Sequence, residues 1–182
     1  KDPSVPLLER LRFLTIFSTN MDEFFEIRVA GLRQRAEYGI VTTGGDGMPA
    51  AEVLHRIAEL APALVAEQYR VLNEDLIPAL EREGVRVLRR LQWNPQQAAW
   101  AKKYFLNEVL PVLTPIGLDP SHPFPKVLNK GLNFIITLEG RDAFRRAASS
   151  AILQVPRALP RVIKLPVKVS GGPHDFVLLS SI

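Results

Sequence analysis

The stretch LLERLRFLTIFSTNMDEFFEIRVAGLRQR, residues 7–35, decides the first part of the fold. Its apolar residues recur at steps of three and four from Leu7 to Leu32, and this spacing predicts one amphipathic helix with a single apolar stripe. Pro6 comes directly before the pattern, a position at which a helix tolerates proline. A polar tripeptide, Ser-Thr-Asn at positions 18–20, interrupts the middle of the stretch, and its role is the main question that the sequence raises.

A second helical pattern runs from Ala50 to Glu83, again with apolar residues at helical spacing. Pro62 and Pro78 fall inside it, and because proline lacks a backbone N–H we expect each to break or kink the helix. Four glycines and a proline in GIVTTGGDGMP, residues 39–49, predict the loop between the two helical stretches. Residues 1–84 are therefore predicted to form an all-α domain, a small helical bundle.

The pattern of apolar residues in the sequence changes near Gly84. Residues 85–91 alternate as a short strand does, and Asn94-Pro95 then predicts the start of a helix. A proline-rich crossing follows, and after it come four β-rich runs bounded by Gly or Pro: LNFIITLEG, AILQVP, RVIKLP and DFVLLSS. The short basic link RDAFRRAASS separates the first two of these runs. The fold class is thus α+β, an N-terminal all-α helical bundle over residues 1–84 followed by a partial, truncated α+β domain over residues 85–182.

The composition is that of an ordinary globular chain: of 182 residues, 47% are apolar and 23% are charged. No apolar run approaches the ~20 residues that a membrane-spanning helix needs, and nothing resembles a signal peptide. The absence of cysteine excludes disulfides and thiolate metal sites and fits a reducing cytoplasm. The formal charge of +4 is compatible with a polyanionic partner and with a solvated surface alike. The chain starts without methionine and stops directly after an apolar run, so we expect a piece of a longer protein.

Three histidines are candidates for nucleophilic or metal chemistry: His55, His122 and His174. They lie far apart, and none has a carboxylate or a second histidine at a metal-ligand spacing, so we expect ordinary surface or capping histidines. The glycine-rich TTGGDGMP lacks both the GK[ST] ending and the preceding strand of a phosphate loop. Arginines suited to phosphate lie in both halves, although solvated faces explain most such residues: Arg28, Arg33, Arg35, Arg141, Arg145, Arg146, Arg157 and Arg161.

Asn20, Asp22 and Glu23 form a polar cluster in the first predicted helix, and two roles are open. If a helix begins there, Asn20-x-x-Glu23 is a capping box, and the two acids stabilise the helix start through its dipole. If the helix continues unbroken, Asn20 falls at the border of the apolar stripe, four residues from Ile16 and from Phe24. Its amide can then offer a donor and an acceptor to the edge of a ligand. The residues favour a structural role for the acids and leave the roles of Asn20 balanced.

Two longer motifs carry a resemblance to a known family. RLRFLTIFSTNMDEFFEIRVAGLRQR, residues 10–35, and VLPVLTPIGLDPSHPFPKVLNKGLNF, residues 109–134, resemble two signatures of the large, histidine-phosphorylating type of bacterial polyphosphate kinase. The motifs occur in the family's order, and the match spans nearly the whole chain. The resemblance implies an N-terminal helical domain followed by the first part of the family's head domain, without the opening helix that usually precedes the first motif.

The resemblance also implies a function. The family uses ATP and Mg²⁺ to extend inorganic polyphosphate, reversibly, through a phosphohistidine. The asparagine of its S-x-N-[LM]-D-E motif contacts the nucleotide, and that position is Asn20 here, while Asp22 and Glu23 are expected to hold the helix start. The phosphorylated histidine, the magnesium ligands and the main phosphate-binding residues lie in C-terminal domains, and His122 is not at the catalytic histidine's position. We therefore expect no catalytic residue and no metal ligand in this sequence, which would be inactive alone.

The implied partners are ATP and ADP, inorganic polyphosphate and further copies of the chain, because the head domain is implicated in dimer contacts in the family. The alternative function is a non-catalytic dimerisation or assembly module with no direct ligand role. The implied location is the cytoplasm, with peripheral membrane association as a family alternative. A nucleic-acid partner, suggested by the pI of 9.6, is not expected, because no basic strand motif interleaved with aromatic residues occurs.

Overall fold

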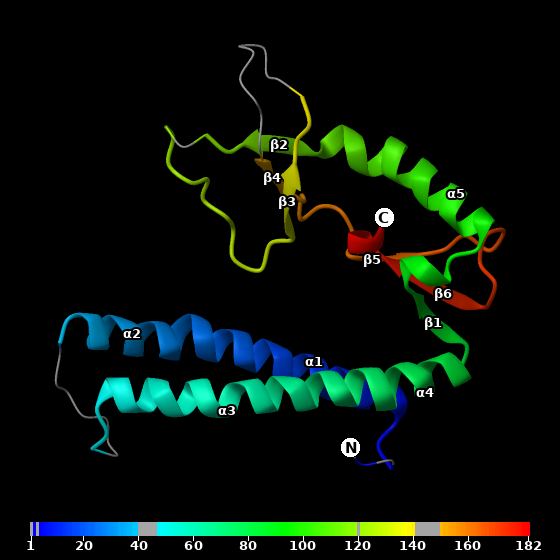
Figure 1. The fold of residues 1–182 in the computed structure, drawn as a ribbon. Helices are drawn as coiled ribbons and strands as arrows, with labels where there is room; N and C mark the ends of the chain where they lie inside the picture. The colour runs from blue at the N-terminus through cyan, green and yellow to red at the C-terminus, as the bar shows by residue number, and fades with distance from the viewer. Residues whose placement is uncertain (1, 3, 40–46, 120, 141–149) are drawn as a thin grey trace. The chain divides into compact units, whose positions relative to one another are not determined.

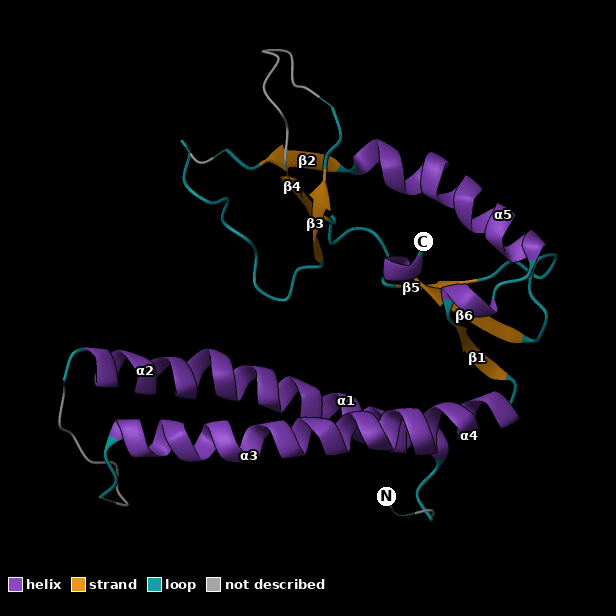
Figure 2. Ribbon diagram, viewed as in Figure 1, coloured by secondary structure: helices purple, strands orange, loops and turns teal. Residues whose placement is uncertain are grey.

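The computed structural model describes residues 2, 4–39, 47–119, 121–140 and 150–182. They divide into two compact units, a first unit of residues 1–85 and a second unit of residues 86–182. Figure 1 traces both units along the chain, and Figure 2 shows that the first is helical while the strands lie in the second. The structure thus has the predicted α+β class, with an all-α first part. The loop and the basic link expected around residues 40–46 and 141–149 lie outside the described residues.

The first unit is a pair of long helical segments. One runs without a break through α1 (Leu7–Glu23), the π-helical segment η1 (Phe24–Val29) and α2 (Ala30–Glu37). The other runs through α3 (Ala50–Arg70), the π-helical segment η2 (Val71–Leu76) and α4 (Ile77–Arg82). Because α2 contacts α3 while α1 contacts η2, the two segments lie antiparallel, as Figure 1 shows. Both predicted helices are confirmed.

The two prolines of the second segment behave differently. Pro62 lies inside α3, which continues through it, so the predicted break does not occur there. Pro62 and Ala58 are both exposed, and solvent can therefore hydrate the carbonyl group that proline leaves without a hydrogen bond. Pro78 lies in the first turn of α4, directly after the π-helical segment. The helix there changes its hydrogen-bonding pattern without ending.

The core of the first unit is thin. Its fully buried residues are few: Val29, Ala50, Val71, Leu76 and Leu80. Most of the predicted apolar stripe of α1 is half-buried against the second segment: Leu7, Leu11, Leu14, Phe17 and Met21. Two helices in contact each bury only one side, so their remaining faces are open to solvent in this unit. The exposed faces are the ones on which function has to be sought.

The second unit contains two small sheets. One has the order β1–β6–β5, with β1 (Val85–Leu88), β5 (Val162–Lys164) and β6 (His174–Leu178), and β5 pairs with β6 in antiparallel fashion. The other has the order β2–β4–β3, with β2 (Thr114–Gly117), β3 (Asn133–Thr137) and β4 (Ser150–Gln154), and β4 pairs with β2 and β3 in antiparallel fashion. In this second sheet Ile152 of the central strand pairs with Ile116 on one side and with Ile135 on the other. All five strand runs predicted from the sequence are confirmed.

Strand β2 was not predicted, because it lies in the proline-rich crossing. Pro115 is the second residue of β2. Because β2 is an edge strand, the backbone N–H that proline lacks need not be one that forms a hydrogen bond to the neighbouring strand. Helix α5 (Pro95–Tyr104) starts as predicted. The Asn94 side chain accepts a hydrogen bond from the Gln97 backbone N–H at 2.9 Å, and the Gln97 side chain accepts one from the Asn94 N–H at 3.0 Å. This capping box satisfies two free donors at the helix start.

Short helical turns complete the second unit. They are η3 (Arg90–Gln92), η4 (Phe105–Val109), η5 (Leu110–Val112) and η6 (Leu179–Ser181). The buried cluster joins the end of α5 to the β1–β6–β5 sheet and consists of Val109, Val155, Ile163, Leu165, Val177 and Leu179. Trp100 and Tyr104 stack beside it with ring centroids 5.2 Å apart. The second unit therefore has a core of its own.

A buried ion pair joins β1 to β6. The Arg86 Nε and Nη2 atoms donate to the two carboxylate oxygens of Asp175, each at 2.7 Å, and the Asp175 side chain is fully buried. The Gly171 backbone N–H donates to the same carboxylate at 2.8 Å. The hydrogen bonds from Arg86 hold the pKa of Asp175 below its ordinary value, against burial, which raises it. This ion pair therefore connects β1, at the start of the second unit, to β6, near its end.

Candidate functional site

Asn20 lies in the middle of a continuous helix and not at a helix start. The helix begins at Leu7, with Pro6 before it and no side chain capping it, and it continues beyond Glu23 into η1. The capping-box interpretation of Asn20 and Glu23 is therefore wrong, and so is the assignment of Asp22 and Glu23 to a helix start. The apolar periodicity on both sides stabilises one long helix, which outweighs a local capping signal worth about 1 kcal/mol.

Asn20 lies on an exposed row of large apolar side chains. Phe13, Ile16, Phe24 and Ile27 are 36–64% exposed, and they precede and follow the exposed Asn20 at steps of three and four. We call these five residues the Asn20 face. Residues at such steps share one side of a helix, so the amide lies between apolar neighbours. Exposed apolar groups gathered around one polar group are typical of a binding surface.

The sequence pattern had placed Phe24 and Phe25 in the buried stripe, whereas the structure exposes both. The helix widens into the π-helical segment η1 at Phe24, whose backbone N–H is shared between the carbonyl oxygens of Asn20 and Met21. Such wide turns occur frequently at functional sites. The two phenyl rings meet edge to face, with centroids 5.6 Å apart and planes at 82°. The aromatic pair thus begins one helical turn after Asn20 along the chain.

An apolar hollow of about 350 Å³ adjoins this face at its N-terminal end. Phe13 belongs to both, and Leu14, Phe17, Val71 and Leu76 complete the apolar wall. Arg10 also lines this hollow, and its Nε is a buried donor with no hydrogen-bond partner in the described part of the chain. The described residues of the Asn20 face and of this hollow together offer aromatic surface, an amide, the cation of Arg10 and the carboxylate of Asp2.

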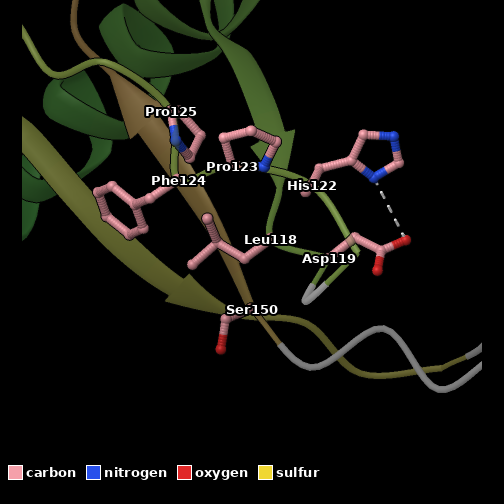
Figure 3. Close-up of a pocket in the computed structure, with 8 residues that line it drawn as sticks. Leu118, Asp119, His122, Pro123, Phe124, Pro125 and Ser150 are labelled. Carbon is pink, nitrogen blue, oxygen red and sulfur yellow. Dashed lines mark ion pairs between the residues drawn. The ribbon is translucent and has the colours of Figure 1, made fainter.

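A second hollow, of about 340 Å³, lies in the second unit over the motif DPSHPFP (Figure 3). Its lining includes Leu118, Phe124 and Pro125. His122 lies at its rim, with Nδ1 3.8 Å from an Asp119 carboxylate oxygen.

Serine, histidine and aspartate are close here, but their geometry is that of a turn. The Asp119 Oδ1 accepts hydrogen bonds from the Ser121 N–H at 2.9 Å and from its Oγ at 2.8 Å. The Ser121 Oγ is also 3.1 Å from the His122 Nδ1. All three side chains belong to one short turn, and His122 is largely exposed. The expectation of an ordinary histidine at this position agrees with that geometry.

The other two histidines do not join either hollow. His55 is exposed on α3, with Nε2 3.3 Å from Glu59 Oε1, and His174 is exposed at the start of β6. Among the residues that the structure describes, no three histidine or acidic side chains are grouped so that they could hold a metal ion. The described helices also include none long and apolar enough to span a bilayer.

The predicted arginines do not gather into a described phosphate site. Arg28 and Arg33 are exposed on η1 and α2. Arg157 donates to the Asn129 carbonyl oxygen at 2.7 Å, which gives it a structural contact. Arg141, Arg145 and Arg146 lie outside the described residues. Arg10, which the sequence did not single out, is the arginine that lines a hollow beside the Asn20 face.

Comparison with known proteins identifies two family domains along the chain. The family model described as polyphosphate kinase N-terminal domain matches residues 1–88, and that described as polyphosphate kinase middle domain matches residues 96–182. The polyphosphate kinase of Burkholderia cenocepacia (strain HI2424) is 55% identical over 180 residues, which is 99% of this chain and 26% of that protein. That of Paraburkholderia phytofirmans (strain DSM 17436) is 53% identical over 181 residues, which is 100% of this chain and 26% of that protein.

A solved structure agrees with these matches. The polyphosphate kinase from Porphyromonas gingivalis aligns with a TM-score of 0.79 and 26% sequence identity, over 99% of this chain and 26% of that one. The chain thus spans about a quarter of the length of the relatives it matches. The two family matches together cover nearly all of its residues, in the same order as the two domains' names. The chain belongs to the polyphosphate kinase family.

Proposed function

We propose that the full-length protein transfers the terminal phosphate of ATP to inorganic polyphosphate, reversibly, through a phosphohistidine. In the first step the bond between the γ-phosphorus and the β–γ bridging oxygen breaks, a phosphorus–nitrogen bond to imidazole forms, and ADP leaves. In the second step that bond breaks and the phosphoryl group joins the terminal oxygen of the polyphosphate chain. The names of the relatives and the family of the two matched domains support this proposal.

This chain contributes one wall of the nucleotide site through Asn20. The observation that carries this assignment is the exposed amide at the centre of four exposed apolar side chains. A purine base presents two apolar faces and an edge of donors and acceptors. The phenyl and aliphatic groups of the Asn20 face suit the faces of the base, and the amide suits its edge.

The chemistry of transfer is assigned to the part of the protein outside this chain. None of the three histidines lies on the Asn20 face, and each is exposed in a setting of its own. Phosphoryl transfer also needs cations that neutralise the developing charge, and magnesium supplies that in kinases. The described side chains offer no group of metal ligands, so we assign magnesium to no residue of this chain.

An assembly module with no direct ligand role is the second candidate. One observation favours it: α3 also exposes two large apolar residues one turn apart, Leu60 and Leu64. Such a pair suits contact with another copy of the chain, in a cytoplasmic or membrane-associated oligomer. The two roles can coexist. Sedimentation of the 182-residue chain at high concentration tests the second, and a strict monomer argues against it.

The variant Asn20→Ala in the full-length enzyme tests the nucleotide assignment. One lost hydrogen bond is worth about 1 kcal/mol, so the KM for ATP should rise about five-fold while the KM for polyphosphate stays unchanged. Asn73→Ala is the matched control, because Asn73 is also an exposed asparagine in a helical segment of the first unit. An unchanged KM for ATP in Asn20→Ala would refute the assignment.

A further inference from the structure

The segment between β2 and β3 exposes apolar side chains on a well-fixed backbone. We call residues 121–132 the Phe124 loop. Its exposed large residues are Phe124 at 66%, Val127 at 42% and Leu128 at 55%. Phe124 also lines the hollow in Figure 3, together with Leu118 and Pro125. Phe124 is thus shared by the loop and the hollow in the second unit.

Side chains from the neighbouring strand and the segment after it hold this loop. The Gln154 Nε2 donates to the Lys126 carbonyl oxygen at 3.2 Å, and the Arg157 Nη2 donates to the Asn129 carbonyl oxygen at 2.7 Å. Lys130 has a φ of 56°, a left-handed conformation that a residue with a side chain seldom adopts. Side chains therefore hold two of the loop's carbonyl groups, while its apolar side chains are left open.

A fixed loop with open apolar side chains is suited to docking. Ordering a loop at the moment of binding costs free energy, and a loop that is already held avoids most of this cost. The charges around the surface restrict what binds there. Lys126, Lys130 and Arg157 are cationic and outnumber the Asp119 carboxylate at the hollow, so two copies of the surface placed face to face would bring like net charges together. A second copy of the same surface is therefore disfavoured as the occupant.

We infer that the Phe124 loop is the docking surface for the C-terminal remainder of the same polypeptide. The relatives are about four times as long as this chain, which covers 26% of them. The matched domains are described as N-terminal and middle, so the relatives continue beyond the middle domain. A segment joined to the chain binds at high effective concentration and needs only a modest apolar contact. The inference rests on family membership and does not depend on the role of Asn20.

Photo-crosslinking in the full-length enzyme tests this inference. p-Benzoylphenylalanine replaces Phe124, and equal amounts of ¹⁴N- and ¹⁵N-labelled protein are unfolded and refolded together before irradiation, so that any oligomer contains both isotopes. The expected result is a crosslink from position 124 to peptides beyond residue 182, with both peptides carrying the same nitrogen isotope. Crosslinked pairs of mixed isotope would show that another subunit occupies the surface, and the absence of crosslinks would show that it is free. Either result overturns the inference.

A stability comparison gives a second readout. Phe124→Ser should change the melting temperature of the 182-residue chain by less than 1–2 °C, because the side chain is exposed there. In the full-length enzyme it should lower the transition of this region by about 2–4 °C or more. Val167→Ser is the control, because Val167 is 90% exposed in the same unit and lies outside the loop. Equal small effects of Phe124→Ser in both proteins would contradict the inference.

Discussion

Replacing Asp175 by asparagine keeps the shape of the side chain and removes its charge, which isolates the contribution of the buried ion pair. In the wild type the carboxylate accepts two hydrogen bonds of 2.7 Å from Arg86 and one of 2.8 Å from the Gly171 N–H. The variant replaces one acceptor oxygen by an NH2 group, so at least one of these hydrogen bonds is lost, and Arg86 is left without its counter-charge. The second unit, which this pair ties from β1 to β6, should be destabilised.

The magnitude follows from the burial of the two partners. Breaking a fully buried ion pair costs about 3–5 kcal/mol. The Asp175 side chain has no exposed surface, whereas that of Arg86 is 36% exposed and keeps part of its hydration. We therefore expect a loss of about 3 kcal/mol, at the lower end of that range. At about 2–4 °C per kcal/mol, this corresponds to a fall in melting temperature of about 6–12 °C.

Urea and thermal unfolding of the 182-residue chain, followed by tryptophan fluorescence, measure this loss. Trp93 and Trp100 both lie in the second unit and pack against its core, so the signal reports on that unit. Glu139→Gln is the matched control, because it removes an exposed carboxylate from the same unit and should cost less than about 0.5 kcal/mol. Equal stability of Asp175→Asn and the control would refute the reasoning.

The remaining predictions concern pH and phosphorylation. Because the folded pKa of Asp175 lies below its ordinary value of 3.8, the pair's contribution is complete above that value and is lost as the pH falls through the folded pKa. The stability difference between wild type and Asp175→Asn should therefore shrink in that acidic range, and a difference independent of pH would contradict it. The 182-residue chain incubated with ATP and Mg²⁺ should incorporate no phosphate on histidine. Stoichiometric acid-labile phosphate, measured with γ-³²P-labelled ATP, would contradict the assignment of the chemistry to the rest of the protein.

The sequence predicted the elements well where a long periodic pattern carried the signal. Both helical segments of the first unit, the start of α5 at Asn94 and five of the six strands follow from spacing and from capping residues. Strand β2 was missed, because Pro115 argues against a strand unless its position at a sheet edge is known. The unbroken passage of α3 through Pro62 depends on solvent exposure at that turn, which the pattern did not show.

The candidate site was predicted in part. The sequence singled out Asn20 but left two roles open for it, a helix cap and a ligand contact. The unbroken helix in the structure excludes the capping box. Phe13 and Ile27 were missed as its neighbours, although their steps of three and four to Ile16 and Phe24 were visible in the sequence. The Arg86–Asp175 pair joins residues 89 positions apart, and no local pattern specifies such a contact. Long-range pairing is settled by packing, which periodicity does not encode.

The most direct test of the central claim is photolabelling of the full-length enzyme with 8-azido-ATP, whose reactive group is on the base. Trypsin cleaves after Arg12 and Arg28 and so releases the whole Asn20 face as one peptide, residues 13–28. We predict that this peptide is labelled and that excess ATP prevents its labelling. Labelling confined to other peptides, or labelling of residues 13–28 that ATP does not prevent, would contradict the claim that Asn20 lies at the nucleotide.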